Sequence, residues 1–373
     1  MSTNLNQPLG GHDKSNFIQV WRGIAALLVI YYHLSNRVPP EYLGMHDRPS
    51  IIFYSGKIGV LIFFIISGYL IVQSLQFSRN LASFYAKRIS RIWPLFILAS
   101  VIIFLFLQFF EPPMVPSGPK KFFVESRSVV DLFGSIFFLE DLGFHWMDGV
   151  FWSILVELKF YMWIGILAVI DPKQFVRWFS MAAIAISGAE MLIEVANNPA
   201  LRPLQLVLNG FLIAQYLPFF AIGGLRVTRK NPELLMAVVV LSLIQAGFKT
   251  AMNPDLDAFK TAQFAFVLVG IVALDAVLLK SRIFLVLGDY SYSWYLFHQM
   301  IGLSLIKWLS GTLNYDGALL VALATTFLIS VVASWAAEWR FRNSCYQLLM
   351  AIFSRLGLQH LKPSARVAEA MPS

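Results

Sequence analysis

Long apolar runs alternate with short polar segments along almost the whole chain. A helix needs about 20 apolar residues to cross the hydrocarbon core of a bilayer, and roughly ten runs approach that length. They cover residues 17–35, 58–75, 94–110, 150–170, 175–195, 204–225, 234–248, 262–279, 290–309 and 317–337. A further apolar run, 131–139, is too brief to span and is typical of a re-entrant or interfacial segment, or of a lead into the next span. The pattern predicts an all-α integral membrane protein with about ten transmembrane helices in one bundle.

The composition agrees with this fold class. The chain has 373 residues, of which 58% are hydrophobic and only 13% are charged, whereas about 25% are charged in a soluble domain. The first apolar run begins near Phe17 and no small-residue cleavage site follows it, so we expect a retained span and not a signal peptide. A single cysteine, Cys345, excludes an internal disulfide and a cysteine-built metal site, and no metal is expected.

Basic and acidic residues occupy alternate connections between the apolar runs. The basic ones are Arg79, Lys87, Arg88, Arg91, Arg226, Arg229, Lys230, Lys280, Arg282, Arg340, Arg342, Arg355, Lys362 and Arg366. Since basic connections favour the inside, we expect both termini in the cytoplasm, with tails at 1–16 and 340–373 around a transmembrane domain at 17–339. The net charge of +8 then reflects topology and membrane lipid, with no nucleic-acid partner.

Two ionisable residues lie in the first run, where charge is expensive. Arg22 and His33 are eleven positions apart, which places them on one helical face, roughly 16 Å apart along the axis. A cation at one end and a titratable base at the other could bind an anionic donor and transfer a proton. The alternative is an arginine that reaches lipid phosphate and an interfacial histidine. These two residues alone do not separate the two interpretations.

A second polar stripe lies in the run 150–170. Ser153, Glu157 and Tyr161 are spaced four residues apart and therefore share a helical face. A carboxylate at this depth should face the bundle interior and pair with a cation or a histidine, for which Arg22 and His33 are available. It either orients a catalytic histidine or forms a structural ion pair between helices.

Three shorter motifs each have a functional and a structural interpretation. Arg88 and Arg91, three residues apart, suit phosphate recognition or attraction to anionic lipid. Ser67, followed by Gly68, allows close approach of a ligand or simply of another helix. His298, within an aromatic segment, is either a second site histidine or a hydrogen-bonded packing residue. No P-loop, zinc pattern, dinucleotide motif or nucleophile elbow accompanies them.

Together these segments resemble the acyltransferase 3 family of membrane acyltransferases, over residues 17–339 and most specifically in Arg22 and His33 with ten residues between them. The sequence around Trp21 is similar to that of the exopolysaccharide-acetyltransferase branch of the family. The other matching segments are Phe63 to Tyr69, Arg88 to Arg91, Trp152 with Ser153, Glu157 and Tyr161, and Ser291 to His298. Gln19 and Leu61 stand where many members have an aspartate, and no hydrolase-like extracellular domain is appended.

The resemblance implies an enzyme that moves an acetyl group from acetyl-CoA to a sugar hydroxyl of a bacterial surface or secreted glycan. It implies a multi-pass protein of the bacterial inner membrane, with polysaccharide-assembly proteins as possible partners. His33 would be the general base, supported by Glu157 and with Arg22 in the catalytic set. Arg88, Arg91 and Arg22 would bind the acyl-CoA. Residues expected to contact the substrate are Ser67, Tyr69, Trp152, Ser153, Tyr161 and His298.

The same buried Arg, His and Glu residues also fit a proton-coupled transporter or flippase for a glycan or lipid-linked sugar. The absence of an internal sequence repeat counts against a carrier, since many carriers are built from repeats. The joint occurrence of the motifs favours the enzyme.

Overall fold

We describe the protein from a computed structural model, in which residues 11–51, 56–110, 128–251 and 281–363 are placed. Those residues are almost entirely helical and contain no strand. Six helices include a segment long and apolar enough to cross a membrane. They are α1 (Gly11–Asn36), α2 (Lys57–Phe77), α3 (Leu81–Phe109), α5 (Trp152–Ile170), α6 (Phe175–Ala196) and α13 (Tyr315–Arg355). The protein is therefore a multi-pass α-helical membrane protein, as the apolar pattern predicts.

The other predicted spans have mixed outcomes. The run 234–248 lies in α9 (Pro232–Ala251) and the run 290–309 in α12 (Ser291–Leu309), which follows the short α11 (Arg282–Asp289). The run 204–225 is broken into α7 (Arg202–Leu206), a π-helix (Val207–Phe211) and α8 (Leu217–Thr228). The run 262–279 lies outside the described residues. The count of ten is thus not established, and the described residues contain six candidate spans.

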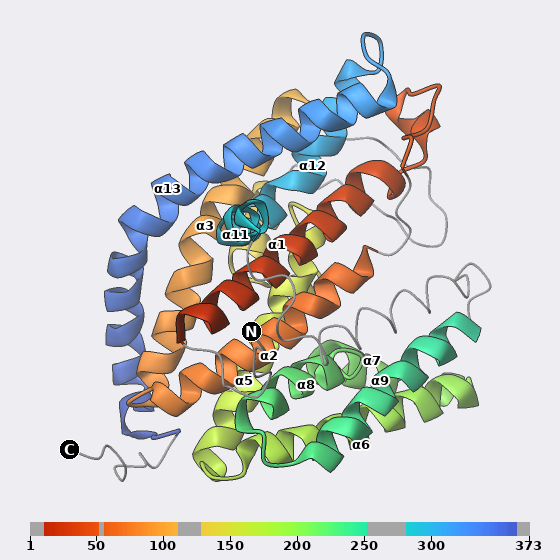
Figure 1. The fold of residues 1–373 in the computed structure, drawn as a ribbon. Helices are drawn as coiled ribbons and strands as arrows, with labels where there is room; N and C mark the ends of the chain where they lie inside the picture. The colour runs from red at the N-terminus through yellow and green to blue at the C-terminus, as the bar shows by residue number, and fades with distance from the viewer. Residues whose placement is uncertain (1–10, 52–55, 111–127, 252–280, 364–373) are drawn as a thin grey trace, which may run out of the picture.

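Glycines bring two pairs of helices into backbone contact. A Cβ on Gly23 of α1 would lie 2.3 Å from the carbonyl oxygen of Phe284, and one on Gly288 would lie 2.0 Å from that of Gln19. A Cβ on Gly68 of α2 would similarly lie 2.1 Å from the carbonyl oxygen of Phe220 in α8. Small residues allow this approach, so the packing role considered for the Ser67–Gly68 pair is confirmed. In Figure 1, α11 accordingly lies across α1.

The last helix is longer than one span. α13 has 41 residues, and Figure 1 shows it following α12 in its first half and α3 in its second. The backbone amide of Leu81, at the start of α3, donates to the carbonyl of Leu361 at 2.8 Å. The segment after the predicted transmembrane domain therefore continues as helix to Arg355 and docks beside α3.

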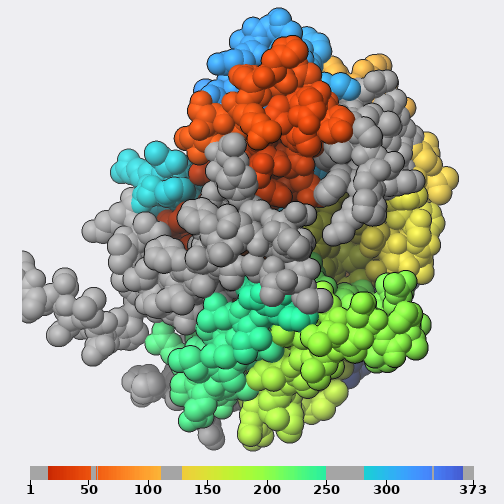
Figure 2. Space-filling view, turned by 90° about the vertical axis from the view of Figure 1, so that its right-hand side faces the viewer, coloured from red at the N-terminus to blue at the C-terminus, as the bar shows by residue number. Residues whose placement is uncertain are grey.

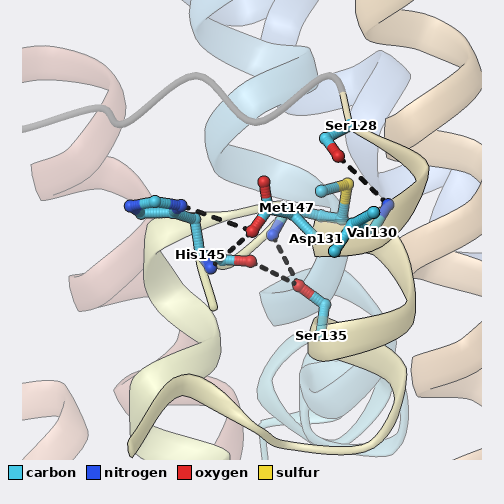
Figure 3. Close-up of polar contacts among 6 residues, drawn as sticks. All are labelled: Ser128, Val130, Asp131, Ser135, His145 and Met147. Carbon is cyan, nitrogen blue, oxygen red and sulfur yellow. Dashed lines mark hydrogen bonds and ion pairs between the residues drawn. The ribbon is translucent and has the colours of Figure 1, made fainter. Parts of the chain in front are cut away.

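Residues 128–151, which precede α5, are folded on themselves through polar contacts. This segment begins with α4 (Val129–Ile136), and near its far end the amide of His145 donates to Asp131 at 2.9 Å. Ser135 donates to the carbonyl of His145 and accepts from the amide of Met147 (Figure 3). On the face drawn in Figure 2, this segment forms the right-hand edge, and α6 and α9 form the lower part. The contacts fix the approach of the chain to α5.

Candidate active site

A pocket of about 110 Å³ lies among α1, α2, α3, α5 and α12. Seven of the residues predicted from the sequence line it, and they come from four of these helices. They are Arg22, Ser67, Arg88, Arg91, Ser153, Glu157 and Tyr161. Residues far apart in the chain thus converge on one cavity, which favours the functional interpretation of each over lipid attraction or packing alone.

Glu157 holds two hydroxyl groups at the centre of this pocket. The hydroxyls of Ser67, from α2, and of Tyr161, one turn further along α5, both donate to the same carboxylate oxygen at 2.5 Å. The helical stripe predicted from the spacing is therefore real, and its carboxylate links α2 to α5.

The arginines of the pocket are held by neighbouring groups. Arg88 donates through Nη2 to the carbonyl of Leu70 at 2.8 Å. Arg22 donates through Nη1 to Gln19 at 2.9 Å, and Gln19 in turn donates to Asp289 at 2.6 Å. Gln19 thus connects Arg22 to Asp289, an acid at the end of α11. The three guanidinium groups give the pocket a strongly positive lining suited to an anionic ligand.

His33 lies beside His298 and outside the lining of this pocket. His33 Nδ1 and His298 Nε2 are 2.8 Å apart, and the rings are nearly parallel, at 11°. His298 Nδ1 lies 2.7 Å from the carbonyl oxygen of Tyr295. A carbonyl only accepts, so Nδ1 of His298 carries the proton, and in the neutral ring Nε2 accepts from His33 Nδ1. His33 Nε2 is then left with a free lone pair and is the basic atom of the pair.

No hydrogen bond joins His33 to Glu157 among the described residues, and Oε1 of Glu157 accepts from Ser67 and Tyr161 instead. The partner that orients His33 is His298. Nothing in a helical repeat could have indicated this partner, because the two histidines are 265 positions apart.

Tyr295 adjoins both the pocket and the histidine pair. Its ring lines the pocket, its hydroxyl lies 2.7 Å from Ser153 Oγ and 2.9 Å from the carbonyl oxygen of Val150, and its own carbonyl holds His298. The side chain is buried, at 6% exposure. Tyr295 therefore links the lining of the arginine pocket to the histidine pair through a single residue.

Asp148 is a site-supporting residue that sequence reasoning left among the loop acids. It is fully buried and accepts from the amides of Val150 and Met300 and from the side chain of Gln299. Burial raises its pKa to about 7, although these three donors act in the opposite direction. Asp148 therefore ties the start of α5 to the residues that follow His298 in α12.

Besides His298, two predicted contact residues lie outside the lining of the pocket. Trp152 packs against Tyr216, with ring centroids 5.3 Å apart, and against Phe64, which itself lines the pocket. Tyr69 is half-buried one turn from the pocket, and its backbone faces Gly223 of α8. Trp152 thus supports the wall of the pocket from behind.

The family profile described as an acyltransferase domain matches residues 15–339. The chain belongs to the acyltransferase 3 family. This acyltransferase shares 23% identity over 313 residues with a protein named putative acetyltransferase ORF330 of Acidianus two-tailed virus, covering 82% of the chain and 87% of that protein. It shares 24% identity over 333 residues with acyltransferase MdmB of Streptomyces mycarofaciens, covering 79% of the chain and 82% of that protein.

The O-acetyl transferase of Shigella phage Sf6 is 28% identical over 165 residues, which cover 41% of the chain and 46% of that protein. No solved structure matches the chain. The predicted family and the predicted class of enzyme are both confirmed: the protein is a membrane acyltransferase.

Proposed function

We propose that this acyltransferase moves an acetyl group from acetyl-CoA to a sugar hydroxyl of a bacterial surface or secreted glycan. The observation that carries the proposal is the adjacency of a pocket lined by three arginines to a histidine pair, half-buried His33 and buried His298, with a free ring nitrogen. The names of two relatives support acetyl as the group transferred. The basic connections support the bacterial inner membrane with both termini in the cytoplasm.

The donor would approach the arginines. Arg88 and Arg91 are one turn apart on α3, and Arg22 faces them from α1 across the same pocket. A cavity of about 110 Å³ is too small for a whole nucleotide cofactor, so it would take the acyl end of acetyl-CoA while the phosphates meet guanidinium groups at its mouth.

The acceptor hydroxyl would meet His33. Nε2 takes the hydroxyl proton as the oxygen attacks the thioester carbonyl; the new C–O bond forms, the C–S bond breaks and CoA leaves, taking up the proton from His33 as a thiol. His298, through its bond to Nδ1, holds the tautomer that makes Nε2 basic. General-base assistance of this kind contributes about 10²–10⁴-fold in rate. In this scheme Glu157 organises the pocket through Ser67 and Tyr161 and supports His33 only indirectly.

The acetyl content of the cell's glycan after His33→Ala tests the proposal. We expect acetylation to fall to background while the protein accumulates normally in the membrane. His145→Ala, which removes a half-exposed histidine of the loop, is the matched control and should leave acetylation unchanged. Normal acetylation in His33→Ala would remove His33 from the mechanism.

Proton-coupled transport is a second candidate function, additional to acyl transfer, because broken helices such as α7–α8 are typical of carriers. Purified protein in vesicles separates the two functions. Release of CoA from acetyl-CoA that depends on His33 favours the enzyme, whereas sugar uptake driven by a proton gradient without CoA release favours the carrier.

A further inference from the structure

A second buried polar site lies where the helix of residues 202–228 is broken. Between the π-helix and α8, Ile213 adopts a positive φ of 51°, and the carbonyls freed by the break are bonded by side chains from neighbouring helices. Lys159 donates to Gly210 at 2.7 Å, and Ser187 donates to Ala214 at 2.6 Å. Irregular backbone at this depth persists only where it is bonded by protein or lines a polar site.

Glu190 of α6 lies against this break and is fully buried. One of its carboxylate oxygens, Oε1, accepts from the side-chain amides of Asn209 and Gln215, both at 3.2 Å. Its other oxygen, Oε2, has no hydrogen-bond partner within the described part of the chain. The same holds for Oδ1 of Asn209 and for Oε2 of Glu194, one helical turn further along α6. Three buried acceptor oxygens on adjoining residues therefore lack a donor.

No cation of the described residues lies within ion-pair distance of Glu190. The basic residue near the break, Lys159, is paired with Asp141 at 2.6 Å. A buried carboxylate without a counter-charge is unfavourable by several kcal/mol. A proton on Oε2 would neutralise it but could be donated to only one of the other two unpartnered oxygens, so the third would still lack a donor. A water molecule would bond both oxygens but would leave the charge.

We propose that Glu190, Asn209 and Glu194 form a binding site for a hard metal cation of the Na⁺ or Ca²⁺ type. Carboxylate and amide oxygens are the ligands such ions prefer, and no nitrogen or sulfur ligand is present among these three residues. Broken membrane helices offer further carbonyl oxygens at the same place. A bound cation would supply both the positive charge that Glu190 lacks and the partner that the three oxygens lack.

The site is connected to the pocket wall by a short path. Gln215, which donates to Glu190, precedes Tyr216, whose ring lies 5.3 Å from that of Trp152 and 5.2 Å from that of Phe64. Phe64 lines the arginine pocket. The bound cation would thus fix the broken helix and, through Tyr216, one wall of the pocket. The inference is independent of the acyl acceptor and donor.

Thermal unfolding of the purified full-length protein, followed by tryptophan fluorescence, tests this site. NaCl is titrated against choline chloride at constant ionic strength, and CaCl₂ is titrated in a parallel series. One of the two metals should raise Tm by about 5 °C at a concentration about a hundred times its dissociation constant. Glu190→Gln should abolish the rise, whereas Glu41→Gln, an exposed acid outside the site, should keep it.

Asn209→Asp provides a second variant with the opposite signature. The added carboxylate should lower Tm without the metal and shift the half-maximal metal concentration at least about tenfold lower. Equal metal-induced rises in wild type and Glu190→Gln would overturn the proposal. The proposal would also be overturned if the Tm of wild type responded to neither metal and its pH dependence disappeared in Glu190→Gln. That outcome would assign a proton to the site.

Discussion

The carbonyl oxygen of Tyr295 sets the chemistry of two histidine rings. By accepting a hydrogen bond from His298 Nδ1–H, it makes the other nitrogen of that ring an acceptor, and His33 must then donate to it. His33 consequently presents Nε2 as a base without any carboxylate contact. A carboxylate in the orienting position would place a negative charge beside His33, whereas the neutral ring of His298 does not.

His298 can therefore be tested as a positioning residue. His298→Ala should lower kcat about 10- to 100-fold, less than the loss in His33→Ala, with little change in the KM for acetyl-CoA. His298→Gln, whose amide oxygen can accept from His33 Nδ1, should recover part of the rate. The measurement is CoA release at saturating donor. A rate equal to wild type in His298→Ala, or no recovery in His298→Gln, would contradict the positioning role.

The arginine pair gives a prediction about affinity. Arg88→Ala with Arg91→Ala should raise the KM for acetyl-CoA more than the KM for the acceptor, by at least about tenfold, because two charged hydrogen-bond donors are removed from the pocket. Arg79→Ala, an exposed arginine that precedes the same helix, is the matched control. An unchanged KM for acetyl-CoA would place the donor elsewhere.

Removing the carboxylate of Glu157 should also destabilise the fold. Glu157→Ala leaves the hydroxyls of Ser67 and Tyr161 unpaired beside Arg88, a loss of about 3 kcal/mol, whereas Tyr161→Phe removes one bond and should lose about 1 kcal/mol. Thermal unfolding of the two variants in the same detergent compares them. Equal stabilities would show that Glu157 does not hold α2 against α5.

At the residue scale, the sequence predicted which residues of one helix share a face, because helical periodicity relates them. The stripe of Ser153, Glu157 and Tyr161 and the pair Arg88 and Arg91 follow from spacing within single helices, and the structure places them on one cavity. The pairing of His33 with His298 joins helices far apart in the chain, so no spacing rule could predict it.

Among the elements, the start of α5 has a role that its apolar run did not show. Asp148 bonds the amide of Val150, which begins the turn into α5, and the amide of Met300 in α12. This single acid aligns the helix that carries Glu157 with the helix that carries His298. In the sequence it differs in no way from its neighbouring loop acids.

The raised pKa of Asp148 predicts a pH dependence of stability. Since its pKa is about 7 in the fold and 3.8 in the unfolded chain, the folded protein binds the proton more tightly. This contribution is complete below about pH 4 and is lost as the pH rises through 7, by at most about 4 kcal/mol. The Tm of wild type minus the Tm of Asp148→Asn should therefore fall between pH 4 and pH 7. A difference that is constant or that grows would contradict the direction.

The break in the helix of residues 202–228 also escaped the sequence. Hydropathy averages over a window, and the run 204–225 is apolar enough for one continuous span. The π-helix and the turn at Ile213 depend on partners from α5 and α6 that bond the free carbonyls. Such partners exist only in the assembled bundle.

For the whole molecule, the six long apolar helices and the family were predictable, because span length and motif spacing are local properties. Orientation follows from the charge asymmetry alone and can be tested with Cys345, the single cysteine. We expect a membrane-impermeant maleimide to label it in inverted vesicles and not in intact cells. A Glu41→Cys variant in a Cys345→Ser background should give the reverse. Labelling of Cys345 from outside would invert the proposed topology.

The position of Tyr295 has a consequence for the membrane itself. An enzyme that meets its donor at one face and its acceptor at the other opens a polar route through a layer that must hold an ion gradient. Tyr295, whose hydroxyl is bonded to Val150 and Ser153, would close such a route beside the pocket. In the proposed reaction the thioester and the acceptor hydroxyl would meet next to this residue, while the permeability of the bilayer to protons and small ions stays low.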